Sequence, residues 1–242
     1  MQIKVSIVPL SIVKYLIIGV IFFTVISTGI QISKYVFNYH QEWMNMLNLD
    51  REMNFPTWYS AFMLGFGSIL LRIIAIGKNQ KSDRYTGDWK LLSLIFTLLA
   101  IDEVLSIHEI FIIPEVSNAL HLPWFLHSMW VIPGTIFVVW FLKRYWKFSR
   151  HLPLRSQQHF ILAAAVYIGG ALVMEMVGSY VAEAKGQQYL PYALITTVEE
   201  VMEMVGIIIF IYGLLYYLGR WMQDLELQIK ILGTESKNSN FP

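Results

Sequence analysis

The stretch LLAIDEVLSIHEIF, residues 98–111, places four ionisable groups within an apolar run: Asp102, Glu103, His108 and Glu109. Apolar residues fill almost all of its other positions, which is typical of a helix buried in a protein or a membrane. A charged side chain near the centre of a bilayer costs about 2.5–3.5 kcal/mol, even on the lenient insertion scale. The stretch therefore predicts a membrane helix whose acidic side chains face neighbouring helices or a wet cavity.

The composition of the whole chain also indicates a membrane protein. Of its 242 residues, 56% are hydrophobic and only 14% are charged, and the mean hydropathy is +0.52. Soluble domains usually contain about 25% charged residues. The net charge of +1 gives no electrostatic basis for nucleic-acid binding. The lack of cysteine excludes disulfides, thiolate metal sites and cysteine nucleophiles.

Six segments are long and apolar enough to cross a bilayer, which takes about 20 residues per helix. They cover residues 10–36, 57–77, 89–113, 124–146, 158–182 and 192–218. The first is longer than the ~7–15-residue apolar core of a signal peptide, so we expect it to be retained. The sequence thus predicts an all-α fold, a polytopic six-transmembrane-helix bundle. Residues 1–232 would be its single domain, and residues 233–242 a disordered polar tail.

Lysine and arginine are concentrated in two of the short connections, residues 78–90 and 143–155. The three other connections contain only one arginine, Arg51, and one lysine, Lys185. Because basic connections tend to stay in the cytoplasm, this bias predicts that both termini are cytoplasmic. We therefore expect an integral protein of a bacterial plasma (inner) membrane, with the lipid bilayer as its partner. The same loops could also contact anionic lipid headgroups.

Acidic residues recur at similar depth on three of the predicted spans. At about 1.5 Å per residue, Asp102 and Glu103 lie about 20 Å from the cytoplasmic edge of the third span. The fifth and sixth spans bring further acids to the outer half, and these are Glu175, Glu199, Glu200 and Glu203. At this depth the three spans hold no lysine or arginine, and His108 is the only titratable nitrogen among these acids. Buried acids without cations take up protons or bind metal ions.

Helical geometry indicates which of these acids face inward. At about 100° per residue, Asp102 and Glu109 share one stripe on the third span, with Glu103 to one side and His108 to the other. We expect Glu103, and Glu200 on the sixth span, to point away from the main stripes and to have structural roles.

The pentapeptide MEMVG occurs twice, at residues 174–178 and 202–206. In each copy a glutamate, Glu175 or Glu203, precedes a glycine by three residues. Glycine lets membrane helices approach closely, so the repeat predicts that Glu175 and Glu203 face each other, unless it is a chance recurrence. Glu203 also shares a helix face with Glu199, four residues earlier.

These residues together predict a metal site. Its expected ligands are Asp102, His108, Glu109, Glu175, Glu199 and Glu203, of which His108 and Glu203 are also the candidate catalytic residues. An oxygen-rich site with one histidine favours a divalent Fe or Mn ion, and Zn, Mg or Ca is also compatible. His121 and His127 could add nitrogen ligands or could simply be interfacial.

Two resemblances concern the chemistry of this site. Inward carboxylates from several helices resemble the carboxylate-bridged di-iron bundles, although the predicted spans lack their E-x-x-H pair. The motifs D-E-x4-H-E and E-E-x2-E also resemble patterns of bacterial multipass membrane proteins, and that resemblance implies no activity.

The pattern is compatible with several functions. The first is a metal-dependent oxidoreductase or hydrolase that acts near the outer leaflet, on a lipid or a quinone-like apolar substrate. The second is a proton or cation transporter or channel in which the acids form a relay. The third is a structural or assembly subunit of a larger membrane protein complex. Protonated acids that only link helices by hydrogen bonds would need no ligand.

The connection between the first and second predicted spans can also be interpreted in two ways. Asn54 and Pro56 are typical of the start of a helix. Alternatively, the connection is a lid that donates Asp50 or Glu52 to the acidic site.

Overall fold

The computed structural model describes residues 8–111, 123–126 and 128–223. Within these ranges the fold is all-helical and contains no β-strand. Its helices are α1 (Pro9–Val36), α2 (Phe55–Gln80), α3 (Thr86–Leu105), α5 (Val131–His151), α6 (Leu154–Ile168), α7 (Glu175–Lys185) and α8 (Leu190–Trp221). Short 3-10 turns are η1 (Glu42–Leu47), η2 (His108–Phe111) and η3 (Trp124–Leu126), and a π turn, η4 (Gly169–Met174), joins α6 to α7. The predicted tail, His121 and His127 lie outside the described residues.

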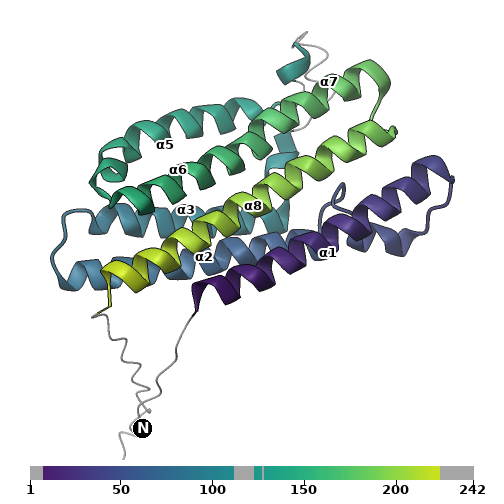
Figure 1. Cartoon of the computed structure of the whole chain (residues 1–242). Coiled ribbons are helices and arrows are strands. Elements are labelled where there is room, and N and C mark those ends of the chain that lie inside the picture. Colours follow the sequence, from purple (N-terminus) through teal and green to yellow (C-terminus); the bar gives the residue numbers. More distant parts are fainter. Residues whose placement is uncertain (1–7, 112–122, 127, 224–242) are drawn as a thin grey trace, which may run out of the picture.

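Among the residues that the structure describes, four helical segments are long and apolar enough to cross a membrane: α1, α2, the continuous segment Leu154–Lys185, and α8. The most apolar part of each has a mean hydropathy between 1.8 and 2.2. Helices α3 and α5, with 20 and 21 residues, run alongside them (Figure 1). The prediction of an all-helical fold is confirmed, and these four helices support a membrane location.

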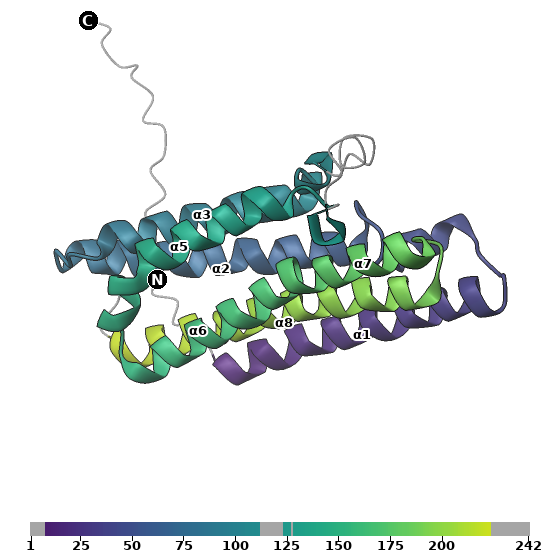
Figure 2. The same ribbon diagram turned by 90° about the horizontal axis from the view of Figure 1, so that it is seen from above.

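Helix α8 is the central element, because it packs against α1, α2, α6 and α7 (Figures 1 and 2). Its buried residues Ile211 and Leu214 belong to the main apolar core, together with Leu71 and Ile74 of α2 and Trp89 of α3. This part of the core lies toward the last residues of α8, whereas the acids of α8 lie near its start. The acids of α8 therefore lie on the side of the bundle away from Ile211, Leu214 and Trp89.

Glycine lets α6 approach α8 closely. A Cβ atom added at Gly206 would lie 2.8 Å from the backbone nitrogen of Tyr167 and 2.9 Å from its Cα atom. A Cβ atom at Gly170 would lie 2.9 Å from the backbone oxygen of Glu199. Backbone atoms cannot rotate out of the way as a side chain can, so these glycines set the distance between the two helices.

The fifth predicted span, residues 158–182, is interrupted by the π turn η4. A π turn contains one more residue than an α-helical turn, so it changes the direction of the side chains that follow it. Glu175 is the first residue of α7 and comes directly after this turn. Directions extrapolated along an unbroken helix consequently do not apply to Glu175.

The prediction that the third span continues to residue 113 is wrong, because α3 ends at Leu105. Ser106 has φ 47° and ψ 45°, in the left-handed region, which ends the helix. The carboxylate of Asp102 accepts a hydrogen bond from the backbone N–H of His108 at 3.1 Å, and such local bonds compete with helical ones. Glu109 is therefore in η2, and the predicted stripe that joins it to Asp102 does not form.

The starts of two other helices follow from their sequences. The Asn54 side chain accepts a hydrogen bond from the backbone N–H of Thr57 at 3.1 Å, and Pro56 is in the first turn of α2. The predicted helix start is thereby confirmed. The predicted span 124–146 begins later than expected, since α5 starts at Val131. Pro133 is in its first turn, where a missing N–H is tolerated.

We expect Gly206→Ala to lower the free energy of unfolding by about 1–3 kcal/mol, because the new methyl group would overlap the backbone of Tyr167. Thermal unfolding of the purified protein in detergent measures the effect. Gly29→Ala is the matched control, since a Cβ atom at Gly29 meets nothing within 4 Å. Equal melting temperatures for the two variants would contradict the close approach of α6 and α8.

Candidate functional site

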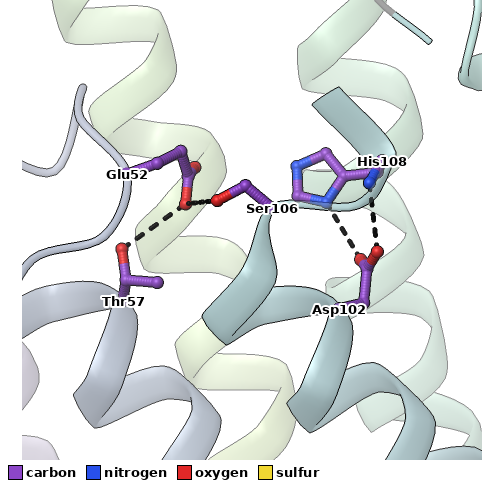
Figure 3. Close-up of polar contacts among 5 residues, drawn as sticks. All are labelled: Glu52, Thr57, Asp102, Ser106 and His108. Carbon is purple, nitrogen blue, oxygen red and sulfur yellow. Dashed lines mark hydrogen bonds and ion pairs between the residues drawn. The ribbon is translucent and has the colours of Figure 1, made fainter. Parts of the chain in front are cut away.

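Asp102 and His108 form an ion pair where α3 ends. The Nδ1 atom of His108 lies 2.9 Å from Oδ2 of Asp102, and the backbone N–H of His108 donates to Oδ1 of the same carboxylate (Figure 3). Two bonds to one carboxylate fix the orientation of the imidazole ring. With Nδ1 donating to Asp102, the second ring nitrogen, Nε2, remains available to a proton or a metal ion.

The surroundings of His108 favour its charged form. Burial lowers the pKa of His108, but the hydrogen bond and charge of Asp102, with the charges of Glu52 and Glu203, raise it to about 9. His108 is therefore a cation at neutral pH, and it partly compensates the acids around it. A metal ion that binds Nε2 would have to displace a proton.

Glu52 reaches the same place from the connection between α1 and α2. Its carboxylate accepts hydrogen bonds from the hydroxyl groups of Ser106 at 3.2 Å and Thr57 at 3.5 Å (Figure 3). Burial raises the pKa of Glu52, and the charge of Glu109 raises it further, while His108 lowers it. The connection thus brings Glu52, which is not among the predicted ligands, to this site, while Asn54 of the same connection starts α2 as predicted. In the sequence, only the position of Glu52 just before Asn54 and Pro56, which start α2, indicated that it could reach the site.

Glu203 of α8 lies next to acids of α3. The Tyr167 hydroxyl of α6 is its side-chain hydrogen-bond partner, and Glu103 and His108 are among its main electrostatic neighbours. Glu200 interacts with the same Glu103. Glu103 and Glu200, which we expected to point away from the main stripes, therefore interact with each other and with other acids, and their structural role stays a prediction. The packing of α3 on α2 brings Glu103 to Ser60 and toward α8, which a single helical wheel cannot show.

Glu175 interacts with Glu199. The MEMVG repeat had predicted that it faces Glu203 instead. Glu175 is the strongest electrostatic neighbour of Glu199, and the two carboxyl groups lie within hydrogen-bonding reach of each other. The hydroxyl group of Ser128 also donates to Glu175, and it lies 3.0 Å from that of Ser179. The π turn before Glu175 accounts for the difference, because it changes the direction in which this side chain leaves the helix.

Five of the six predicted metal ligands thus fall into two neighbouring groups, and the sixth, Glu109, is exposed in η2. Asp102, His108 and Glu203 interact at the end of α3, whereas Glu175 and Glu199 interact between α7 and α8. In the part of the chain that the structure describes, no set of three or more His, Asp or Glu side chains is arranged to hold a metal ion. The metal site therefore stays a prediction.

A groove of about 690 Å³ lies on the outer face of α2 and α3. Its lining is almost wholly apolar and includes Trp58, Phe62, Ile101 and Leu105. It extends to the end of α3 at which Asp102 and His108 lie. An apolar chain of a lipid or a quinone-like molecule would fit such a lining, and the identity of an apolar substrate stays a prediction.

We expect Asp102→Asn to destabilise the protein by about 2 kcal/mol near pH 6 and by much less near pH 10. The folded-state pKa of His108, about 9, is above its ordinary value of 6.5. The pair therefore stabilises the fold fully below pH 6.5, and this contribution is lost as the pH rises through about 9. Melting temperatures of wild type and variant across this range measure the effect. An equal destabilisation of Asp102→Asn at both ends of this pH range would contradict the pairing.

A family profile described as "Domain of unknown function (DUF8692)" matches residues 14–218. The matched part contains Glu52, Asp102, His108, Glu175 and Glu203. A search of curated proteins and a search of solved structures gave no match. Because the profile covers most of the 242 residues, the chain belongs to the DUF8692 family.

Proposed function

We propose that the chain is a membrane protein that binds one or two divalent metal ions at one end of its bundle. It would act there as a metal-dependent oxidoreductase or hydrolase near the outer leaflet, with Fe or Mn as the favoured ion. The observation that supports this proposal most is the orientation of His108. Asp102 holds Nδ1, which leaves Nε2 for a metal, and this is the usual arrangement of a metal-binding histidine and its supporting carboxylate.

The oxygen ligands would come from three different segments. Glu52 of the first connection and Glu203 of α8 both act electrostatically on His108, and Glu103 of α3 acts on Glu203. In this refinement Asp102 is a supporting residue and not a direct ligand. Small side-chain movements of Glu52 and Glu203 would bring their oxygen atoms to the ion. Mutual repulsion of these acids would favour the uptake of a cation.

We expect purified protein to retain stoichiometric metal, and Glu203→Gln and His108→Gln to lose most of it. Elemental analysis of protein produced with iron and manganese supplied measures the retention. Glu183→Gln is the matched control, because Glu183 is exposed on α7, and it should retain wild-type metal. Metal-free wild type, or full occupancy in Glu203→Gln, would contradict the metal proposal.

A proton or cation relay is the second candidate, and the pair of Glu175 and Glu199 favours it. Two carboxyl groups this close repel each other when both are charged, which would favour a shared proton that the pair could accept or release. The apolar core around Trp89 and Ile211 lies toward the other end of the bundle, which favours exchange with one side over a path through the membrane. Absence of metal together with pH-dependent ion flux in liposomes would support this candidate.

We also propose that α3 and α5 are spans, which gives six in total with both termini in the cytoplasm of a bacterial inner membrane. Successive helices alternate in direction, and Arg144 of α5 pairs with Asp88 of α3 at the end that carries the basic connections (Figure 1).

We expect a membrane-impermeant maleimide to label Lys185→Cys but not Arg84→Cys in intact cells or spheroplasts. Both positions are exposed, and they lie at opposite ends of the bundle. The chain has no cysteine, so each variant holds a single thiol. Labelling of Arg84→Cys from outside would reverse the proposed orientation. Glu109→Cys, at an exposed position just after α3, should also be labelled, and its protection from the reagent would contradict α3 as a span.

A further inference from the structure

The connection between α1 and α2 is fastened to two helices by buried polar side chains. The Gln31 amide of α1 donates to the side-chain oxygen of Asn48 at 3.1 Å and to the Thr197 hydroxyl of α8 at 2.9 Å. The Ser27 hydroxyl donates to the same Asn48 oxygen at 3.1 Å and accepts from the backbone N–H of Leu49 at 2.9 Å. Ser27 and Gln31 have no exposed surface. We call these four side chains, Ser27, Gln31, Asn48 and Thr197, the amide–hydroxyl network.

The other end of the connection is fixed by Asn54. Its amide nitrogen donates to the backbone oxygens of Asn48 and Arg51, both at 2.7 Å, and its side-chain oxygen caps α2. Residues 48–54 are therefore held both to the α1–α8 contact and to the first turn of α2. Such a segment cannot swing as a free lid without breaking several buried hydrogen bonds.

Glu52 projects from this fastened segment toward His108. Its carboxylate is hydrogen bonded to Ser106, which lies 54 residues away in the sequence. Glu109 repels it, and burial disfavours its charge. Both effects would move a freely mobile Glu52 outward into water. Contacts of the backbone around Glu52 must therefore keep this residue in place.

We propose that the amide–hydroxyl network positions Glu52 beside His108, so that Gln31 and Thr197 determine the geometry of the site without touching it. This inference rests on the proposed function for the role of Glu52, although the positioning itself does not require a metal. An ordinary contact between α1 and α8 would not need these polar groups, since apolar side chains of similar size pack at least as well. Holding residues 48–54 in place gives these buried polar side chains a role that a simple helix contact would not.

Cross-linking of a cysteine pair tests the positioning directly. In the cysteine-free chain, Glu52→Cys and Ser106→Cys are introduced together and treated with a short bifunctional thiol reagent, because two cysteines are shorter than the native pair. We expect Gln31→Met to slow formation of the cross-link at least about fivefold, as measured by mass spectrometry. Thr197→Val should act in the same direction, and Thr197→Ser, which keeps the hydroxyl group, should restore the parent rate. The control is Thr24→Val, since the Thr24 hydroxyl bonds only within α1, to the backbone oxygen of Val20.

Metal affinity, measured with Mn²⁺ on chains that retain Glu52, gives the second readout. Gln31→Met and Glu52→Gln should weaken binding by similar factors, and the double variant should be no weaker than either, because both act through one residue. A parent rate of cross-linking in Gln31→Met would overturn the positioning role, as would full additivity of the two variants. If wild type binds no Mn²⁺ but Gln31→Met still slows the cross-link, the proposed function fails and the positioning role stands.

Discussion

The burial of carboxylates at one end of an apolar bundle is the constraint on which the other features depend. An acid removed from water needs hydrogen-bond donors or a cation, because its charge is otherwise too costly. The structure meets this need with hydroxyl groups and one imidazole, which come from several helices. The donor and acid pairs are His108 with Asp102, Ser106 with Glu52, Tyr167 with Glu203, Ser60 with Glu103 and Ser128 with Glu175. Hydroxyl groups do not neutralise a carboxylate, so under the proposed function a metal ion or shared protons would compensate these acids.

Close backbone contacts between α8 and the neighbouring segment that contains Tyr167 and Gly170 make these pairings possible. Gly206 and Gly170 let α6 lie against α8, so that Tyr167 reaches Glu203. The π turn that follows redirects Glu175 to Glu199. On the other side of α8, Thr197 joins the network that holds the first connection. One central helix thus organises donors and acids from both ends of the sequence.

Much of this arrangement could be predicted from local patterns. Apolar runs of sufficient length identified the helical membrane-type fold, and Asn54 with Pro56 marked the start of α2. The depth of the acids on α8 followed from simple counting of residues. Predictions that extrapolated a regular helix were wrong, since α3 ends at Leu105 and η4 interrupts the fifth segment. Both irregularities fall next to acidic residues, and at the end of α3 the Asp102 carboxylate competes with the backbone for the N–H of His108.

The sequence by itself determined that the chain is helical and apolar, and that acids without nearby lysine or arginine lie toward one end of its helices. These properties are set by composition and by the rise per residue, which need no knowledge of neighbours. Only the tertiary structure decided which acid meets which partner. Contacts such as Glu52 with Ser106 and Gln31 with Thr197 join residues 54 and 166 positions apart, and their formation depends on how helices pack and where they end.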